Sequence, residues 1–238
     1  MSLLIEFSDS ENEESDEEEE DAEDDATLIF RSIPHVGGVN RIRAQILGDI
    51  KASPPDPPLP YFAATFSETG KVYIFDVAPH LHSLLSPASH SATSLSKKPA
   101  FKINSHARAE GFALAWSPPI GTNPSPRLLS GDIHSKIYLS TINQTGISTS
   151  QAFASHTSSI EDLQWSPTEA TVFASCSADH SLRIWDVRVK DRKSVITVDK
   201  AHDSDVNVLS WNAGTSYLML TGGDEGGLKV WDMRNMKG

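Results

Sequence analysis

The stretch Ala174-Ser175-Cys176-Ser177-Ala178-Asp179, continued by Leu182-Arg183-Ile184-Trp185-Asp186, decides the fold. It contains two short runs of β-forming residues separated by a polar turn, a pattern that predicts two antiparallel strands. The pattern returns at residues 220–232, where the second Trp-Asp pair follows the first by 46 residues. A strand pair that repeats at such a period predicts an array of equivalent β-sheets.

Other landmarks share this period. Trp116, Trp165 and Trp211 succeed one another at intervals of 49 and 46 residues, and His156 lies 46 residues before His202. Independent landmarks with a common period indicate that whole structural units are repeated. We therefore predict an all-β chain.

Two weaker copies lie upstream. Leu139 precedes Trp185 by 46 residues and is expected at the tryptophan position, and Phe75 is expected there in the first unit. The first unit is interrupted by a Pro-rich stretch at 51–60 and by a Ser- and His-rich stretch at 80–98, which is expected to be a surface insertion with exposed His80 and His82. The repeats predict four units, at about residues 35–104, 105–154, 155–200 and 201–238.

These motifs resemble the WD-repeat family, and the resemblance implies a β-propeller in which each unit is one blade. In that family a His, a Ser or Thr, an Asp and a Trp form a hydrogen-bonded tetrad. Its polar atoms become partly buried when blades pack together, so they must satisfy one another. The matching positions are His156, Ser175, Asp179 and Trp185 in the third unit and His202, Thr221, Glu225 and Trp231 in the fourth.

A catalytic reading of His156, Asp179 and Ser175 is disfavoured, because the same set recurs one period later. Cys176 lies inside a predicted strand and is expected to be a buried core thiol. The nine histidines lack metal-site spacing, and the Gly-rich run at 222–227 lacks the Lys-Ser/Thr of a phosphate-binding loop. The sequence therefore predicts neither an enzyme nor a cofactor or metal site.

The negative charge is concentrated at the N-terminus. Residues 1–26 contain 14 of the 32 acidic residues, which leaves 18 acidic against 20 basic residues in 27–238. So polar a segment is expected to be a disordered tail that attracts basic proteins and opposes direct nucleic-acid binding. Ser8, Ser10 and Ser15 are each followed three residues later by Glu; kinase sites and plain acidic linker both remain open.

A closer resemblance rests on residues 35–43, 110–118, 160–179 and 201–208. They look like the glutamate-rich WD-repeat family, which is related to the retinoblastoma-associated histone-binding proteins. The resemblance implies a nuclear and nucleolar ribosome-assembly factor that escorts a basic large-subunit ribosomal protein and also binds histones. It implies a longer protein with seven blades, so this chain is expected to be a fragment. Residues 28–33 could instead supply an outer strand that closes a four-bladed ring.

Lone Cys176 fits a reducing intracellular compartment, and no apolar run is long enough to span a membrane.

Family propellers bind partners near the start of each blade's first strand, so contacts with a basic client are expected at Glu161, Asp162, Asp203 and Asp205. Capping of turns is the alternative for the last two. A substrate receptor of a cullin-type ubiquitin ligase is an alternative function, because the stretches 185–188 and 231–234 both fit W-D-x-R. A histone-binding chromatin factor is another.

Overall fold

A computed structural model describes residues 28–46, 59–85, 95–121, 125–143 and 145–235. All the described sheets lie in the unit Arg31–Gly238. The predicted acidic tail at 1–26, with Ser8, Ser10 and Ser15, lies outside the described residues. Among the described helices, none is long and apolar enough to cross a membrane.

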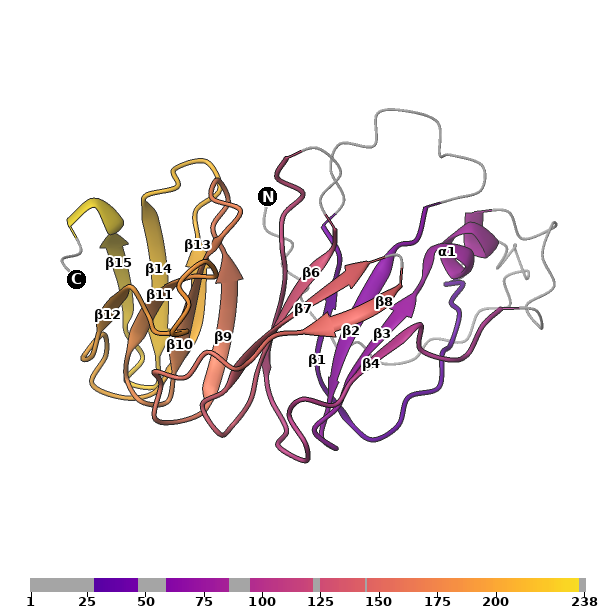
Figure 1. The fold of residues 1–238 in the computed structure, drawn as a ribbon, viewed down its shortest axis with the longest axis horizontal. Helices are drawn as coiled ribbons and strands as arrows, with labels where there is room; N and C mark the ends of the chain where they lie inside the picture. The colour runs from indigo at the N-terminus through magenta and orange to yellow at the C-terminus, as the bar shows by residue number, and fades with distance from the viewer. Residues whose placement is uncertain (1–27, 47–58, 86–94, 122–124, 144, 236–238) are drawn as a thin grey trace, which may run out of the picture. The chain divides into compact units, whose positions relative to one another are not determined.

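The described strands form four antiparallel sheets, and Figure 1 labels most of their strands. The first contains β1 (Val39–Ala44), β2 (Phe62–Ser67), β3 (Val72–Asp76) and β4 (Phe101–Ile103). The second contains β5 (Ala113–Trp116), β6 (Arg127–Gly131), β7 (Ile137–Asn143) and β8 (Gly146–Thr149). The third contains β9 (Ile160–Trp165), β10 (Val172–Ser177), β11 (Leu182–Asp186) and β12 (Ile196–Val198). The fourth contains β13 (Val206–Trp211), β14 (Leu218–Gly223) and β15 (Leu228–Asp232), followed by the 3₁₀ helix η2 (Met233–Asn235).

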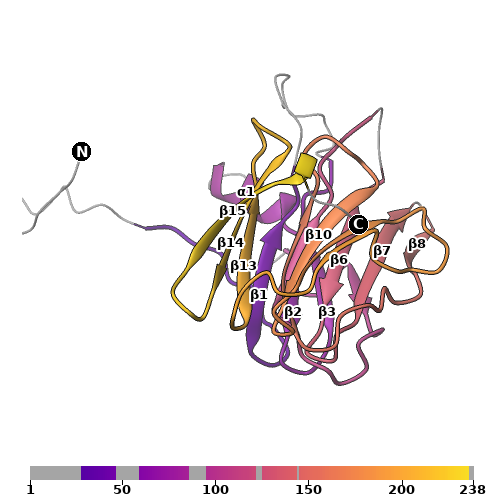
Figure 2. The same ribbon diagram turned by 90° about the vertical axis from the view of Figure 1, so that its left-hand side faces the viewer.

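Each sheet is a blade in which consecutive strands are neighbours. Figure 2 shows β13, β14 and β15 side by side in chain order. Tight turns join the second and third strands, and the equivalent turns of two blades place Ser135 and His180 in the left-handed region, each at φ 65°. These four blades, arranged as a β-propeller, agree with the fold expected from the repeats.

The hydrophobic core is divided among the spaces between blades. Buried side chains from neighbouring sheets meet in three clusters, because each sheet has two faces that must be covered. Representative members are Phe66, Ile74 and Leu114 between the first two blades, Phe153, Phe173 and Trp185 between the second and third, and Leu182, Ile184 and Val206 between the third and fourth.

The far face of the fourth blade keeps the same apolar pattern but is exposed. By strand pairing, Leu228 and Val230 are equivalent to Leu182 and Ile184 of the third blade. Leu228 and Val230 are 77% and 68% exposed, whereas Leu182 and Ile184 are 1% and 4% exposed. The fourth blade therefore presents a face with the composition of a blade-packing surface.

The strand pairing corrects one alignment made from the sequence. In the third blade Trp185 pairs with Phe173. The residue at the Phe173 position of the second blade is Leu128, and it pairs with Ser140 rather than with Leu139. Ser140 therefore occupies the tryptophan position. The spacing of 46 residues does not hold between these two blades, because the loop between β5 and β6 is longer than the loop between β9 and β10.

Two other expectations are also corrected. His80 is buried rather than exposed, because the predicted insertion begins with the helix α1 (Ala78–Leu85), which turns that side chain inward; His82 is exposed as expected. Residues 28–33 form no strand, and the fourth sheet has three strands in the described part of the chain. The four-bladed closure therefore finds no support.

Replacing Phe173 with Ala is expected to lower the free energy of unfolding by about 3–5 kcal/mol, because it empties a fully buried site between blades. Phe173 stacks on Trp185 with ring centroids 5.7 Å apart, so the loss includes an aromatic contact. Urea titration followed by tryptophan fluorescence measures the change. Val195→Ala, at an exposed position, is the control; equal losses in both variants would contradict a core located between blades.

Candidate functional site

The tetrad of the third blade is a continuous chain of hydrogen bonds. Trp185 Nε1 donates to Ser175 Oγ at 2.7 Å, and Ser175 Oγ lies 2.6 Å from His156 Nε2. His156 Nδ1 lies 2.9 Å from Asp179 Oδ2. Because an indole can only donate and a carboxylate can only accept, the protons run from Trp185 through Ser175 and His156 to Asp179. The imidazole in this chain is neutral and carries its proton on Nδ1.

The electrostatics of the tetrad agree with that direction. Burial lowers the pKa of His156, despite the neighbouring Asp179. Burial alone would raise the pKa of Asp179, but hydrogen bonds from His156, Ser181 and the Thr157 backbone hold it well below its usual value. The pair is therefore a neutral imidazole and an ionised carboxylate near neutral pH.

The fourth blade forms the same chain with a longer acidic residue. Trp231 Nε1 donates to Thr221 Oγ1 at 2.8 Å, and His202 Nε2 lies 2.7 Å from that hydroxyl. His202 Nδ1 contacts Glu225, whose pKa is lowered to about 2, chiefly by hydrogen bonds from Ser204 and His202. Glu225 thus takes the acidic position given by the blade period, although Asp224 precedes it.

The second blade contains a buried triad that sequence reasoning left incomplete. His106 Nε2 lies 2.7 Å from Ser130 Oγ, and its Nδ1 lies 2.7 Å from Asp132 Oδ2. Asp132 directly follows strand β6 and comes two residues after Ser130, whereas Asp179 comes four residues after Ser175. The signal that could have found it is the pair Ser130 and Asp132 downstream of His106. In the first blade, His35 Nε2 lies 2.9 Å from Thr65 Oγ1.

These groups are arranged for structure. Ser175 Oγ is fully buried and is bonded to both Trp185 and His156, so it has no approach for a substrate. Burial raises the pKa of the Cys176 thiol well above its ordinary value, which keeps it in the weakly reactive thiol form. In the part of the chain that the structure describes, no group of three His, Cys, Asp or Glu side chains could hold a metal ion.

Of the four residues expected to contact a client, three are at least partly exposed and Asp162 is buried. Asp203 is exposed and Asp205 and Glu161 are half-exposed, all close to the start of the innermost strand of a blade. Asp205 faces His180 of the preceding blade at 3.5 Å. The tetrad residues His156 and His202 lie at the same end of the blades as Glu161, Asp203 and Asp205. We call this end the His end.

The structure corrects the assignment of Asp162. Its side chain is buried and its oxygens accept hydrogen bonds from Leu163 N at 3.0 Å and Leu209 N at 3.3 Å. Gln164 acts alike, because its Oε1 accepts from Trp211 N at 2.7 Å. Burial raises the pKa of Asp162, while these backbone donors lower it. Asp162 therefore joins β9 to β13 across the blade boundary.

The innermost strands are also joined by their tryptophans. Trp116 Nε1 donates to Arg43 O at 2.9 Å, and Trp165 Nε1 donates to Ala115 O at 3.1 Å, so each indole bonds to the preceding blade. Trp211 instead bonds within its own blade, to Ser216 O at 2.7 Å. Between these strands lies a hollow of about 580 Å³ with largely apolar walls.

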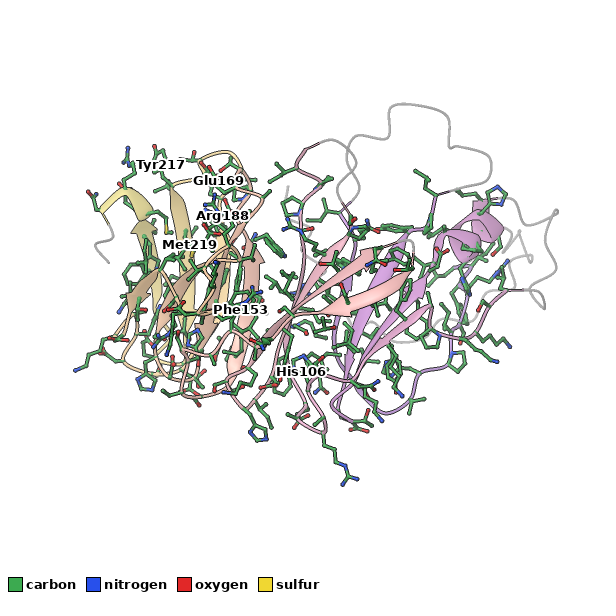
Figure 3. All side chains as sticks on the ribbon, viewed as in Figure 1. His106, Phe153, Glu169, Arg188, Tyr217 and Met219 are labelled. Carbon is green, nitrogen blue, oxygen red and sulfur yellow. The ribbon has the colours of Figure 1, made fainter. Side chains whose placement is uncertain are left out.

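The opposite end of the blades carries the two W-D-x-R arginines. Figure 3 shows Arg188 at one end of the blades and His106 at the other. Arg188 bonds to Asp186 through Nε at 3.0 Å, and Arg234 bonds to Asp232 through Nε at 2.9 Å. Both guanidinium groups remain largely exposed. The shared geometry shows that each arginine secures the turn after the third strand of its blade.

Parts of the blades match a known family of repeats. The model of the family "WD domain, G-beta repeat" matches residues 147–186 and 193–232. The chain is 43% identical over 192 residues to ribosome assembly protein rrb1 of Schizosaccharomyces pombe, an alignment that covers 79% of this chain and 37% of that protein. It is 40% identical to glutamate-rich WD repeat-containing protein 1 of Dictyostelium discoideum, which covers 73% of this chain and 32% of that protein. The chain belongs to the glutamate-rich WD-repeat family.

This glutamate-rich WD-repeat chain spans about a third of the length of those relatives. Among solved structures, it resembles a chain in the crystal structure of the mitotic checkpoint complex, with a TM-score of 0.57 and 20% identity. That match covers 74% of this chain and 45% of the other, and it supports the fold alone.

Asp179→Asn is expected to lower the free energy of unfolding by about 1–3 kcal/mol, because an amide cannot accept every hydrogen bond that the buried carboxylate accepts. Glu225→Gln, at the more exposed equivalent position, is expected to cost less. Urea unfolding of both variants measures the difference. An equal or larger loss for Glu225→Gln would show that burial does not set the strength of the tetrads.

Stability is also expected to fall on acidification. The folded pKa of His156 lies below its unfolded value, so the unfolded chain binds the proton more readily and stability is lost as the pH falls below about 6.5. Asp179 adds a second loss below about pH 4 for the same reason. Urea unfolding at a series of pH values should show a shallower slope between about pH 7 and 5.5 for His156→Gln than for the unsubstituted chain. His134→Gln, an exposed control, should keep the original slope.

Proposed function

We propose that this chain belongs to a protein-binding scaffold that acts in ribosome biogenesis and binds a basic assembly client. The observation that carries the proposal is the 43% identity to a protein named as a ribosome assembly protein. Because the alignment covers only 37% of that relative, the client and the activity of the whole protein are part of the proposal. A nuclear and nucleolar location follows from the same reasoning.

The charge distribution supports a basic client such as a large-subunit ribosomal protein. Residues 1–26 carry 14 carboxylates and no basic residue, so they attract cations over a long range. The His end adds Glu161, Asp203 and Asp205 at the surface of neighbouring blades. Direct nucleic-acid binding is not part of the proposal, because a segment of this charge repels phosphate.

A binding role also suits the way the polar residues are used. The Ser, His and Asp side chains that resemble catalytic groups are tied into tetrads and hold neighbouring strands in place. The blades thereby form a rigid frame whose surface loops are free to contact a partner. We propose accordingly that the chain binds and does not catalyse.

A second candidate is a substrate receptor of a cullin-type ubiquitin ligase. It is favoured by Arg188 and Arg234, which are exposed at corresponding positions of adjacent blades and could contact a ligase adaptor. A histone-binding chromatin factor differs from the leading proposal mainly in its basic client. Copurification distinguishes these functions by the partner recovered: a ribosomal protein, an adaptor or a histone.

Neutralising the surface carboxylates of the His end is expected to weaken client binding. The triple variant Glu161→Gln, Asp203→Asn and Asp205→Asn should bind a basic ribosomal-protein client about tenfold less tightly, because it removes charges that face the partner. Isothermal titration at low salt measures the affinity. Asp191→Asn, an exposed carboxylate in the β11–β12 loop, is the control. Unchanged affinity of the triple variant would place the client elsewhere.

The tail is tested by deleting residues 1–26. The proposal expects slower association and a weaker dependence of binding on salt, since long-range attraction acts mainly on the association rate. Stopped-flow measurements with a basic client at low and high salt report both. An unchanged rate and salt dependence after deletion would remove the tail from the proposal.

A further inference from the structure

Arg41 belongs to the first blade, and its side chain contacts the second and third blades. It lies on β1, and its guanidinium donates through Nε to the carbonyl oxygen of Phe112, which immediately precedes β5. Its Nη2 lies 3.5 Å from the carbonyl oxygen of Glu161 on β9. One half-buried cation therefore contacts the beginnings of the innermost strands of the second and third blades.

One surface carboxylate lies close to this position at the His end. Glu110 accepts a hydrogen bond from Asn40, the residue before Arg41, at 2.9 Å. Glu161 provides a carbonyl oxygen to the guanidinium. The charge of Arg41 also acts on Asp162, whose pKa it lowers against the effect of burial. The acidic His end thus already contains a cation of its own.

Arg43 provides an internal comparison. It lies two residues along the same strand, is exposed, and its Nη1 donates only a local hydrogen bond, to Ile42 O at 3.1 Å. It also lowers the pKa of Asp162, so its charge acts on the same carboxyl group. The two arginines therefore differ in whether the side chain is fixed to the next blades.

We propose that Arg41 occupies, from within the chain, the place that a basic side chain of the client takes at the His end, and so sets which clients bind. The inference rests on the proposed function, because it assumes a cationic client. A client must displace the Arg41 guanidinium from the Phe112 and Glu161 carbonyls or bind beside it against charge repulsion.

This internal competition selects for clients that offer several basic side chains. A single lysine gains little when it must first displace a bonded guanidinium, whereas a strongly basic segment gains further contacts with Asp203 and Asp205. Observed affinity is reduced by the fraction of molecules in which the site is free, so removing the competitor should raise it. A merely structural role for Arg41 predicts lower stability and no gain in affinity.

The test compares Arg41→Gln with Arg43→Gln in the full chain. Both substitutions remove one positive charge from β1, but only the first removes contacts with other blades. The probe is a short polyarginine peptide, with polyglutamate of equal length as a negative control. Fluorescence anisotropy gives the affinity, and thermal unfolding gives the stability. Arg41→Gln should bind polyarginine about fivefold more tightly than the unsubstituted chain, and Arg43→Gln should change the affinity by less than about twofold.

Other outcomes separate the two proposals. If the unsubstituted chain does not bind polyarginine above polyglutamate, the proposed basic client fails. If it binds, but Arg41→Gln binds no more tightly than Arg43→Gln, only the internal competition is overturned. Should Arg41→Gln fail to fold, Arg41→Lys takes its place, since it keeps the charge but loses the forked contacts; an affinity equal to that of the unsubstituted chain then overturns the inference.

Discussion

Face-to-face packing of the blades is the constraint on which the rest of the structure depends. Each sheet covers its neighbour, and the covering buries polar side chains that stand at the blade edge. A buried imidazole between a hydroxyl and a carboxylate is tolerated only when every donor has an acceptor. The chain from Trp185 through Ser175 and His156 to Asp179 meets that condition with one direction of proton donation.

The same constraint explains why the Ser, His and Asp side chains of the tetrads, which resemble catalytic groups, are structural in this chain. A nucleophile must be reachable and a general base must exchange protons, but these groups are buried and fully bonded. Each blade solves the problem with slightly different residues. Glu225 replaces an aspartate in the fourth blade, and Asp132 reaches His106 from a different backbone position in the second. What is maintained is the satisfaction of the hydrogen bonds.

The side chains that packing leaves exposed lie at both ends of the blades. At the His end they include Asp203 and the half-exposed Glu161 and Asp205, and at the opposite end they are the arginines of the W-D-x-R turns. Glu161 and Asp162 show that neighbouring carboxylates on one strand can differ in exposure. Asp162 directly follows Glu161 in β9, yet alternation along the strand turns it toward β13, where it bonds backbone amides rather than a partner.

The sequence by itself determined the blades, their number and the third and fourth tetrads, because those features recur at nearly equal spacings and each repeat uses side chains specific to one position. Only the tertiary structure decided that Ser140 replaces the missing tryptophan, that Asp132 completes the second site, and that Asp162 is buried. Each of these depends on strand register or on the neighbouring blade. A period in the sequence cannot specify either one, since loop lengths vary and the atoms that bury a side chain come from another unit.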